Sequence, residues 1–167
     1  MDELIQIVDA ADRPVGTATK KYARENGLHF RVVGVLLRDG AGRYLLQRRS
    51  AGKDIWPLCW DFSAGGHVNA LEDYKTAARR ELAEELSVHD IPLRFRDKFK
   101  IEELSHGHLA YRFVHLYVAD LIDRPVGLKA DEVAAVEWMT ATEIRRLLAE
   151  QGEQATPNLH RIGSWDL

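Results

Sequence analysis

The chain has 167 residues, of which 46% are hydrophobic and 29% are charged, and its formal net charge is -3. This composition predicts a soluble globular protein of one domain, residues 1–167, with enough chain to bury a core. The small net charge gives no long-range attraction to a nucleic acid polymer or to an anionic membrane, so we expect neither as a partner.

The cysteine content and the hydropathy restrict the protein further. A single cysteine, Cys59, excludes an internal disulfide. No apolar run approaches the roughly 18 residues of a membrane span, and the residues after Met1 do not resemble a signal peptide. We therefore expect a cytoplasmic protein, either a monomer or a homodimer.

The first half of the chain predicts two hairpins and a glycine turn. A polar turn at residues 9–14 connects the two strands of the first hairpin, and Asp39–Gly42 is the turn signal of the second. Residues 20–27 form a short polar connection with one helical turn. The expected strands are Leu4–Val8, Val15–Thr19, Phe30–Arg38, Arg43–Arg48, a short one near Trp60 and Gly66–Val68.

The second half predicts two helices and three strands. Helical periodicity covers Tyr74–Leu86, and a second helix begins with Thr140 or Thr142 as its cap and runs to about Glu150. The expected strands are Leu93–Leu104, Ala110–Leu121 and Val133–Met139, with a loop near Ser105–His108 and no predicted element in residues 151–167. The elements add up to an α/β protein with a mixed sheet between two helices.

The first predicted helix carries an acidic patch. Glu81, Glu84 and Glu85 lie at i, i+3 and i+4, beside an apolar stripe of Ala78, Leu82 and Leu86. Like charges at this spacing repel one another, which favours a compensating cation, and oxygen ligands suit Mg2+ or Mn2+. The alternative is an ordinary solvated acidic face.

The spacing around this helix favours the metal site. Gly66, Glu72, Arg80, Glu81, Leu82, Glu84, Glu85 and Val88 fit the pattern G-x5-E-x7-R-E-U-x-E-E-x-G-U, where U is bulky and aliphatic. The pattern resembles the Nudix box of the Nudix hydrolase superfamily. One position departs from it, because Ser87 replaces a glycine that would end the helix in a left-handed conformation.

The resemblance implies a fold and a set of roles. The fold would be an α/β/α sandwich with a mixed sheet, to which this chain adds an N-terminal hairpin. Glu81 and Glu85 would bind the metal, with Glu84 as a ligand or water anchor and the Gly65 carbonyl completing the shell. Gly66, Glu72 and Arg80 would be structural members of the motif, with Arg80 paired to one of its glutamates.

A second resemblance covers roughly residues 4 to 90. The segments VDAADRPVGTATKKYA, LHFRVVGVLL, LLQRRSAGKDIWPLCW and GGH are similar to the type 1 isopentenyl-diphosphate isomerases and their Nudix hydrolase relatives. This resemblance implies that Arg49 and Lys53 bind a diphosphate, which suits a fork-shaped guanidinium and a mobile ammonium. The alternative is an exposed basic strand end.

The residues that the isomerase reaction needs are not all present. The catalytic cysteine position is occupied by Gly65, and two ligand glutamates would align near Tyr111 and Phe113. His29 and His67 match metal-site histidines, but two imidazoles without further ligands make no complete site. We expect His106 and His108 in an exposed loop.

Other residues are candidates for the remaining tasks. Glu132, after Asp131 and before the last predicted strand, is the best-placed extra base, although it fits a solvated turn nearly as well. The aromatic residues that might hold a flat group of a substrate also fit a core, and they are Trp56, Trp60, Phe99, Tyr111 and Phe113.

These observations predict a metal-dependent hydrolase that cleaves a phosphoanhydride of a nucleoside di- or triphosphate or of another X-linked diphosphate. The catalytic residues would be Glu81, Glu84, Glu85 and Glu132. The alternatives are an isopentenyl-diphosphate isomerase and a catalytically silent nucleotide-binding module.

Overall fold

The N-terminal hairpin leads into a short helix. The computed structural model describes residues 3–105, 107–122 and 127–165. Strands β1 (Leu4–Val8) and β2 (Pro14–Thr19) pair antiparallel, as predicted. Thr19 then caps helix α1 (Lys20–Glu25) by accepting a hydrogen bond from the Tyr22 amide, so the predicted polar connection is a helix of six residues.

Within the described residues, nine strands form one mixed sheet organised around β3 (His29–Arg38). Strand β8 (His108–Asp120) runs parallel to β3 on one side. The other side of β3 pairs in turn with β1, β6 and β4, all antiparallel. The remaining strands are β4 (Tyr44–Arg49), β5 (Trp60–Asp61), β6 (Ala64–His67), β7 (Arg94–Ser105) and β9 (Val133–Met139).

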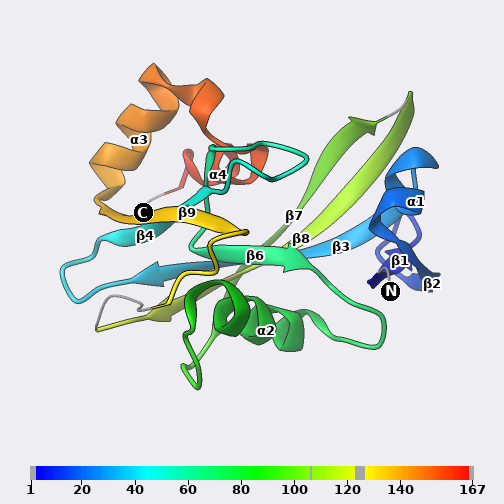
Figure 1. The fold of residues 1–167 in the computed structure, drawn as a ribbon, viewed down its shortest axis with the longest axis horizontal. Coiled ribbons are helices and arrows are strands. Elements are labelled where there is room, and N and C mark those ends of the chain that lie inside the picture. Colours follow the sequence, from blue (N-terminus) through cyan, green and yellow to red (C-terminus); the bar gives the residue numbers. More distant parts are fainter. Residues whose placement is uncertain (1–2, 106, 123–126, 166–167) are drawn as a thin grey trace.

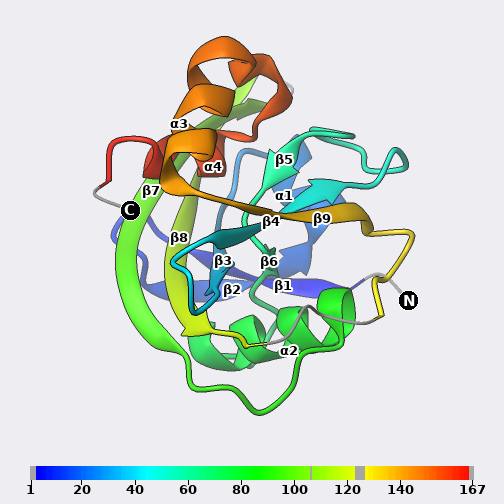
Figure 2. The same ribbon diagram turned by 90° about the vertical axis from the view of Figure 1, so that its left-hand side faces the viewer.

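Helices cover both faces of the sheet (Figures 1 and 2). Helix α2 (Tyr74–Leu86) packs on one face, and α3 (Ala141–Glu150) and α4 (Pro157–Ile162) lie on the other. A 3-10 turn, η1 (Gly152–Gln154), separates α3 from α4. The predicted mixed-sheet α/β fold is confirmed. Among the described residues, no helix is long and apolar enough to cross a membrane.

The sequence predicts no element in residues 151–167, whereas the structure has helix α4 there. Thr156 caps it by accepting from the Leu159 amide, and Pro157 occupies its first turn. Leu159 and Ile162 are fully buried in the core. Six residues carry too little periodicity for a helix to be recognised in the sequence, and packing against the sheet stabilises this one.

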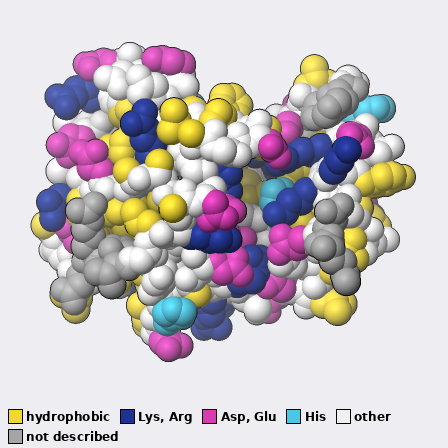
Figure 3. All heavy atoms as spheres, viewed as in Figure 1, with side chains coloured by type: hydrophobic (Ala, Val, Ile, Leu, Met, Phe, Trp, Pro, Cys, Tyr) yellow, Lys and Arg dark blue, Asp and Glu magenta, His cyan; other side chains and the backbone are white. Residues whose placement is uncertain are grey.

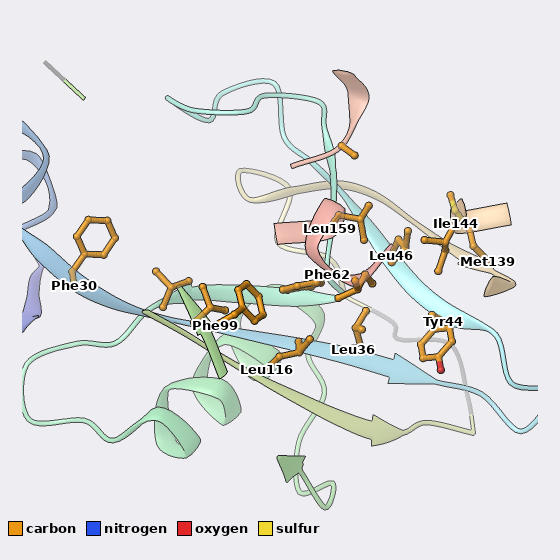
Figure 4. Close-up of a cluster of buried hydrophobic side chains, with 14 of the residues drawn as sticks. Phe30, Leu36, Tyr44, Leu46, Phe62, Phe99, Leu116, Met139, Ile144 and Leu159 are labelled. Atoms are coloured by element: carbon orange, nitrogen blue, oxygen red, sulfur yellow. The ribbon is translucent and has the colours of Figure 1, made fainter. Parts of the chain in front are cut away.

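Two apolar clusters fill the space between sheet and helices. One lies between the sheet and the helices α1, α3 and α4 and extends along the sheet from Phe30 through Leu116 and Leu36 to Ile144, with Leu159 above it (Figure 4). The other lies between the sheet and α2 and holds the buried face of that helix. This second cluster fixes α2 against β6, which sets the position of its acidic residues.

Ser87 ends α2 in the conformation that a glycine would adopt. Its φ of 55° is left-handed, and the Val88 and Ser87 amides donate to the carbonyls of Leu82 and Ala83 in a Schellman arrangement. The Ser87 hydroxyl donates to the Gly127 carbonyl at 2.9 Å. The departure from the motif therefore leaves the helix end intact.

A buried polar network anchors the N-terminal hairpin to the sheet. The Asp12 side chain, in the β1–β2 turn, is buried and accepts from Arg31 Nε at 2.7 Å, Lys98 Nζ at 2.6 Å and the Tyr74 hydroxyl at 3.1 Å. The Tyr74 ring stacks on His115 with 3.5 Å between centroids. These contacts connect the hairpin, the central sheet and the start of α2.

Replacing Asp12 by Asn is expected to lower the free energy of unfolding by about 2 to 4 kcal/mol, because it leaves a buried guanidinium without its counter-charge. Asn tolerates the positive φ of 62° at this position, so the backbone stays compatible. Denaturant unfolding of the variant measures the loss.

Asp120→Asn is the matched control. Asp120 also contacts two basic residues, Arg38 and Arg94, but its side chain is 51% exposed. Solvent-exposed ion pairs contribute little to stability, so this variant should unfold close to the wild type. Equal losses in the two variants would show that the Asp12 network does not anchor the hairpin.

His115 should make stability depend on pH. Burial, followed by the nearby Lys98 charge, lowers the pKa of His115 to about 4 from its ordinary value of 6.5. Between these values the unfolded chain binds the proton and the folded chain does not, so stability falls as pH drops from 6.5 towards 4. His115→Phe, which keeps a ring against Tyr74, should flatten this part of the unfolding-versus-pH curve; an unchanged slope would contradict the assignment.

Candidate active site

A charged cleft of about 330 Å³ lies beside β6 and α2. It is bordered by α1, by the loop after β4 and by the segment before β9. Figure 3 shows this face of the molecule hollowed, with acidic and basic side chains and a histidine gathered in the hollow. Segments far apart in the sequence therefore supply one polar site.

Helix α2 presents two of its three glutamates to the sheet. Asp73 caps the helix by accepting from the Thr76 amide at 2.7 Å. Glu81 and Glu85, one turn apart, are both buried, whereas the Glu84 side chain is 47% exposed. The structure thus brings Glu81 and Glu85 together under β6 and leaves Glu84 at the rim of the cleft.

Glu85 is held by two neutral donors. Its Oε2 accepts from Gln47 Nε2 at 2.8 Å and from the Gly65 amide at 3.1 Å. Burial and then the Glu81 charge raise the pKa of Glu85 to about 8. Burial also raises the pKa of Glu81. Two carboxylates are therefore close together where water screens them poorly.

The two glycines of β6 allow this close approach. A Cβ at Gly66 would overlap the Glu81 carboxylate, and a Cβ at Gly65 would lie 2.7 Å from the Val33 carbonyl oxygen. A side chain at Gly66 would therefore displace the Glu81 carboxylate, and one at Gly65 would press on the backbone of β3.

Arg80 connects the loop before α2 with the acidic residues of the helix. It donates from Nε to Glu72 at 2.8 Å, from Nη1 to Glu81 at 2.8 Å and from Nη2 to the His67 carbonyl at 2.9 Å. Its Nη1 also lies 3.4 Å from Glu84. Glu72 in turn accepts from the Asn69 amide at 3.0 Å. Arg80 therefore fixes the Glu81 side chain relative to the loop.

Arg49, Lys53 and Glu132 line the same cleft. Lys53 and Glu132 form an ion pair, although 79 positions separate them in the sequence. Arg49 donates to the carbonyls of Trp56 and Ile55, each at 3.1 Å, which orients its guanidinium. Asp131, the neighbour of Glu132, is exposed.

The sequence comparisons identify the family. A NUDIX domain model matches residues 28–159. The chain belongs to the Nudix family. An uncharacterized Nudix hydrolase of Pseudomonas aeruginosa is 38% identical over 137 residues, covering 82% of this chain and 78% of that protein. Nudix hydrolases generally use divalent metal ions and act on small phosphorylated compounds, and the chain is an enzyme of this pyrophosphohydrolase class.

One further relative agrees with the resemblance to the isomerases, and one solved structure has a similar fold. An isopentenyl-diphosphate Delta-isomerase of Nocardia farcinica is 34% identical over 163 residues, covering 95% of this chain and 91% of that protein. A crystal structure of a Deinococcus radiodurans protein superposes with a TM-score of 0.81 at 26% identity, covering 96% and 97% of the two chains. The Nudix chain thus lies in the branch that resembles the isomerases.

His67, His29 and Cys59, the residues considered for an isomerase-type site, do not share one site in this Nudix chain. His67 lines the cleft, and burial and then the charges of Lys20 and Arg24 hold its pKa well below the usual range. His29 stacks on Tyr111 at 4.4 Å, and its Nδ1 accepts from the Tyr111 amide at 3.0 Å. Cys59 is buried, and its Sγ lies 3.7 Å from the Glu153 carbonyl oxygen.

The other aromatic and histidine candidates are mostly away from the cleft. Phe99 and Phe113 are buried, Trp60 packs against the core, and Trp56 is 42% exposed beside the site. His108 is exposed as predicted, although it begins a strand, and His106 lies outside the described residues.

Sequence reasoning missed several residues of the site. Lys20 and Arg24 of α1 line the cleft. Their spacing of four residues on a capped helix places them on one face, and this pattern could have indicated a basic side of the site. Gln47, which contacts Glu85, is a buried polar residue on an apolar strand. Within residues 3–105, 107–122 and 127–165, no three His, Cys, Asp or Glu side chains converge as a metal-binding group.

Proposed function

We propose that the chain is a Mg2+- or Mn2+-dependent hydrolase that cleaves a phosphoanhydride of a nucleoside di- or triphosphate or of a related X-linked diphosphate. The observation that carries the proposal is the buried Glu81–Glu85 pair next to a cleft with Arg49 and Lys53. Acidic and basic groups in one cleft suit a metal and a phosphate chain, respectively.

The donor set fits a hard divalent ion. Glu81 and Glu85 are two buried carboxylates whose mutual repulsion a cation would offset, and among the described residues no hydrogen bond reaches Glu85 Oε1. The Gly65 carbonyl and Glu84 are the further ligands that we assign. When bound, such an ion would supply positive charge to offset the negative charge of the phosphates and would make a nearby water more acidic.

The remaining roles fall to side chains around the cleft. Arg49 and Lys53 bind the phosphate oxygens, and Gln47 and the Gly65 amide orient Glu85. A phosphate that pairs with Lys53 would release Glu132 from that ion pair and leave it only the looser contact with Lys129 Nζ at 3.9 Å, a state in which the carboxylate can take a proton from water. Gly66, Glu72 and Arg80 act as positioning residues for Glu81.

An isopentenyl-diphosphate isomerase is the second candidate, favoured by the relative from Nocardia farcinica. Against it, the resemblance places Gly65 at the position of the cysteine acid/base and would align the two ligand glutamates near Tyr111 and Phe113. A binding module without catalysis is the third, and the complete set of Glu81, Glu84 and Glu85 argues against it.

The test is an activity screen with Mg2+ or Mn2+. Its substrates are nucleoside di- and triphosphates, nucleotide sugars, dinucleoside polyphosphates and prenyl diphosphates, with product phosphates measured directly and isopentenyl diphosphate also assayed for isomerisation. We expect metal-dependent release of a phosphate or a nucleoside monophosphate. Isomerisation without hydrolysis would support the second candidate, and tight binding without turnover would support the third.

A further inference from the structure

A smaller pocket adjoins the catalytic cleft and shares residues with it. It has a volume of about 70 Å³ and is lined by Arg24, Arg49 and Arg112, and so we call it the arginine pocket. Arg24, Arg49 and His67 border both spaces. A molecule in the cleft can therefore extend one of its groups into the arginine pocket.

The arginine pocket contains more positive than negative charge. Its acidic neighbours are Asp61, whose Oδ2 lies 3.6 Å from Arg49 Nη1, and Glu103, whose Oε2 lies 2.9 Å from Arg112 Nε. Arg24 Nε is 4.0 Å from Glu103 Oε1. Three guanidiniums thus face two carboxylates, and the excess charge sits in a buried place because Arg112 is only 8% exposed.

Two buried guanidinium nitrogens make no aligned hydrogen bond. Among the described residues, Nε of Arg24 and Nε of Arg112 are buried and make no hydrogen bond. The contact of Arg112 with Glu103 is an ion pair that lacks hydrogen-bond alignment. Glu103 therefore satisfies these donors only in part, which favours a further anionic oxygen at the guanidiniums.

We propose that the arginine pocket binds a compact anionic group of the substrate, a phosphate or carboxylate, in addition to the diphosphate that is cleaved. The proposal rests on the proposed hydrolase function for the position of that diphosphate. Guanidiniums bind both kinds of anion through paired hydrogen bonds. The pocket has the volume of about two water molecules, which admits one such group but not a nucleobase.

The charge of the pocket also argues against an apolar substrate group. A hydrocarbon chain placed there would exclude water from three guanidiniums without giving them an acceptor. The inferred substrates are diphosphates with a further anionic group, either the third phosphate of a triphosphate chain or a phosphate or carboxylate on the group that the diphosphate carries.

The first experiment detects the anion without any catalysis. In metal-free protein with 15N-labelled arginine, the Nε–Hε signals of Arg24 and Arg112 are assigned with Lys variants of each residue and followed during titration with inorganic phosphate. We expect both signals to move with one dissociation constant, while Arg38, which pairs with Asp120 far from the pocket, stays unchanged. Movement of Arg49 alone would overturn the proposal.

The second experiment measures kcat/KM for two matched pairs of substrates with Mg2+. One pair is a nucleoside diphosphate and its triphosphate, and the other is a pentose 1-diphosphate without and with a 5-phosphate. We expect the more anionic member of one pair to be preferred by about tenfold or more, the value of one charge-assisted hydrogen bond. The pair that shows this preference tells whether the anionic group is the third phosphate of the chain or a phosphate on the sugar.

Arg24→Met and Arg112→Met are the variants for this experiment. In each variant the ratio of kcat/KM between the two members of the preferred pair should fall close to one. Arg24→Met provides the test if the buried Arg112 variant does not fold. No preference in the wild type would overturn the arginine pocket as a substrate subsite. If none of the four compounds is hydrolysed, the proposed function is wrong for these substrates, and the phosphate titration still decides whether the pocket binds an anion.

Discussion

Glu85→Gln is expected to lower kcat by about 1000-fold and to increase the stability of the metal-free protein. Gln keeps the shape of the side chain and can accept from Gln47 and the Gly65 amide as Glu85 does. It removes one of two neighbouring buried carboxylates, so the free energy of unfolding should rise by about 1 to 2 kcal/mol. Steady-state kinetics with Mg2+ and denaturant unfolding in a chelator measure the two effects.

The combination of the two changes distinguishes a functional residue from a structural one. If the role of Glu85 were structural, the substitution would lower the stability of the protein. If Glu85 is a metal ligand, the substitution lowers the activity and raises the stability of the metal-free protein. Glu137→Gln, at an exposed position of β9, is the control and should alter neither quantity. Unchanged turnover in Glu85→Gln would refute the catalytic assignment, and a marked loss of stability would indicate a structural role instead.

Gly66→Ala is expected to lower kcat/KM by about 100-fold, because the added methyl group displaces the Glu81 carboxylate from its position. Gly66 does not have a positive φ, so its backbone conformation accepts alanine and the effect arises from the occupied space alone. The displaced carboxylate would also leave its contact with Arg80. Kinetics at saturating metal measure the loss.

Gly40→Ala is the matched control for this substitution. A Cβ at Gly40 meets no atom within 4 Å, so this variant should keep both activity and stability. Activity near that of the wild type in Gly66→Ala would show that the Glu81 carboxylate can move without consequence. The position of Glu81 would then not matter for the reaction.

Local patterns predicted most of the elements. The structure has Tyr74–Leu86 as a helix with the predicted bounds, and the N-terminal hairpin and the long strands lie where alternation and turn residues placed them. These elements carry their own periodicity or turn chemistry. Helix α4 has only the helix-start residues Thr156 and Pro157, because six residues are too few for a period and Leu159 and Ile162 are recognised as core only when they pack against the sheet.

The sequence indicated those candidate site residues that lie close together along the chain. The motif supplied the α2 glutamates and β6 glycines, but Gln47, Arg24 and Arg112 come from three other elements that only the folded sheet brings close. The three glutamates also differ in burial. At 3.6 residues per turn, Glu84 lies about 60° from Glu81 and about 100° from Glu85 around the helix, which turns Glu84 towards solvent.

The most direct test of the metal site is an EPR titration of the protein with Mn2+, comparing the wild type with Glu85→Gln and with the double variant Glu81→Gln/Glu85→Gln. The account predicts that the wild type binds the ion, that Glu85→Gln binds it more weakly and that the double variant no longer binds it at millimolar concentration. Equal binding by all three proteins, or none by the wild type, would contradict it.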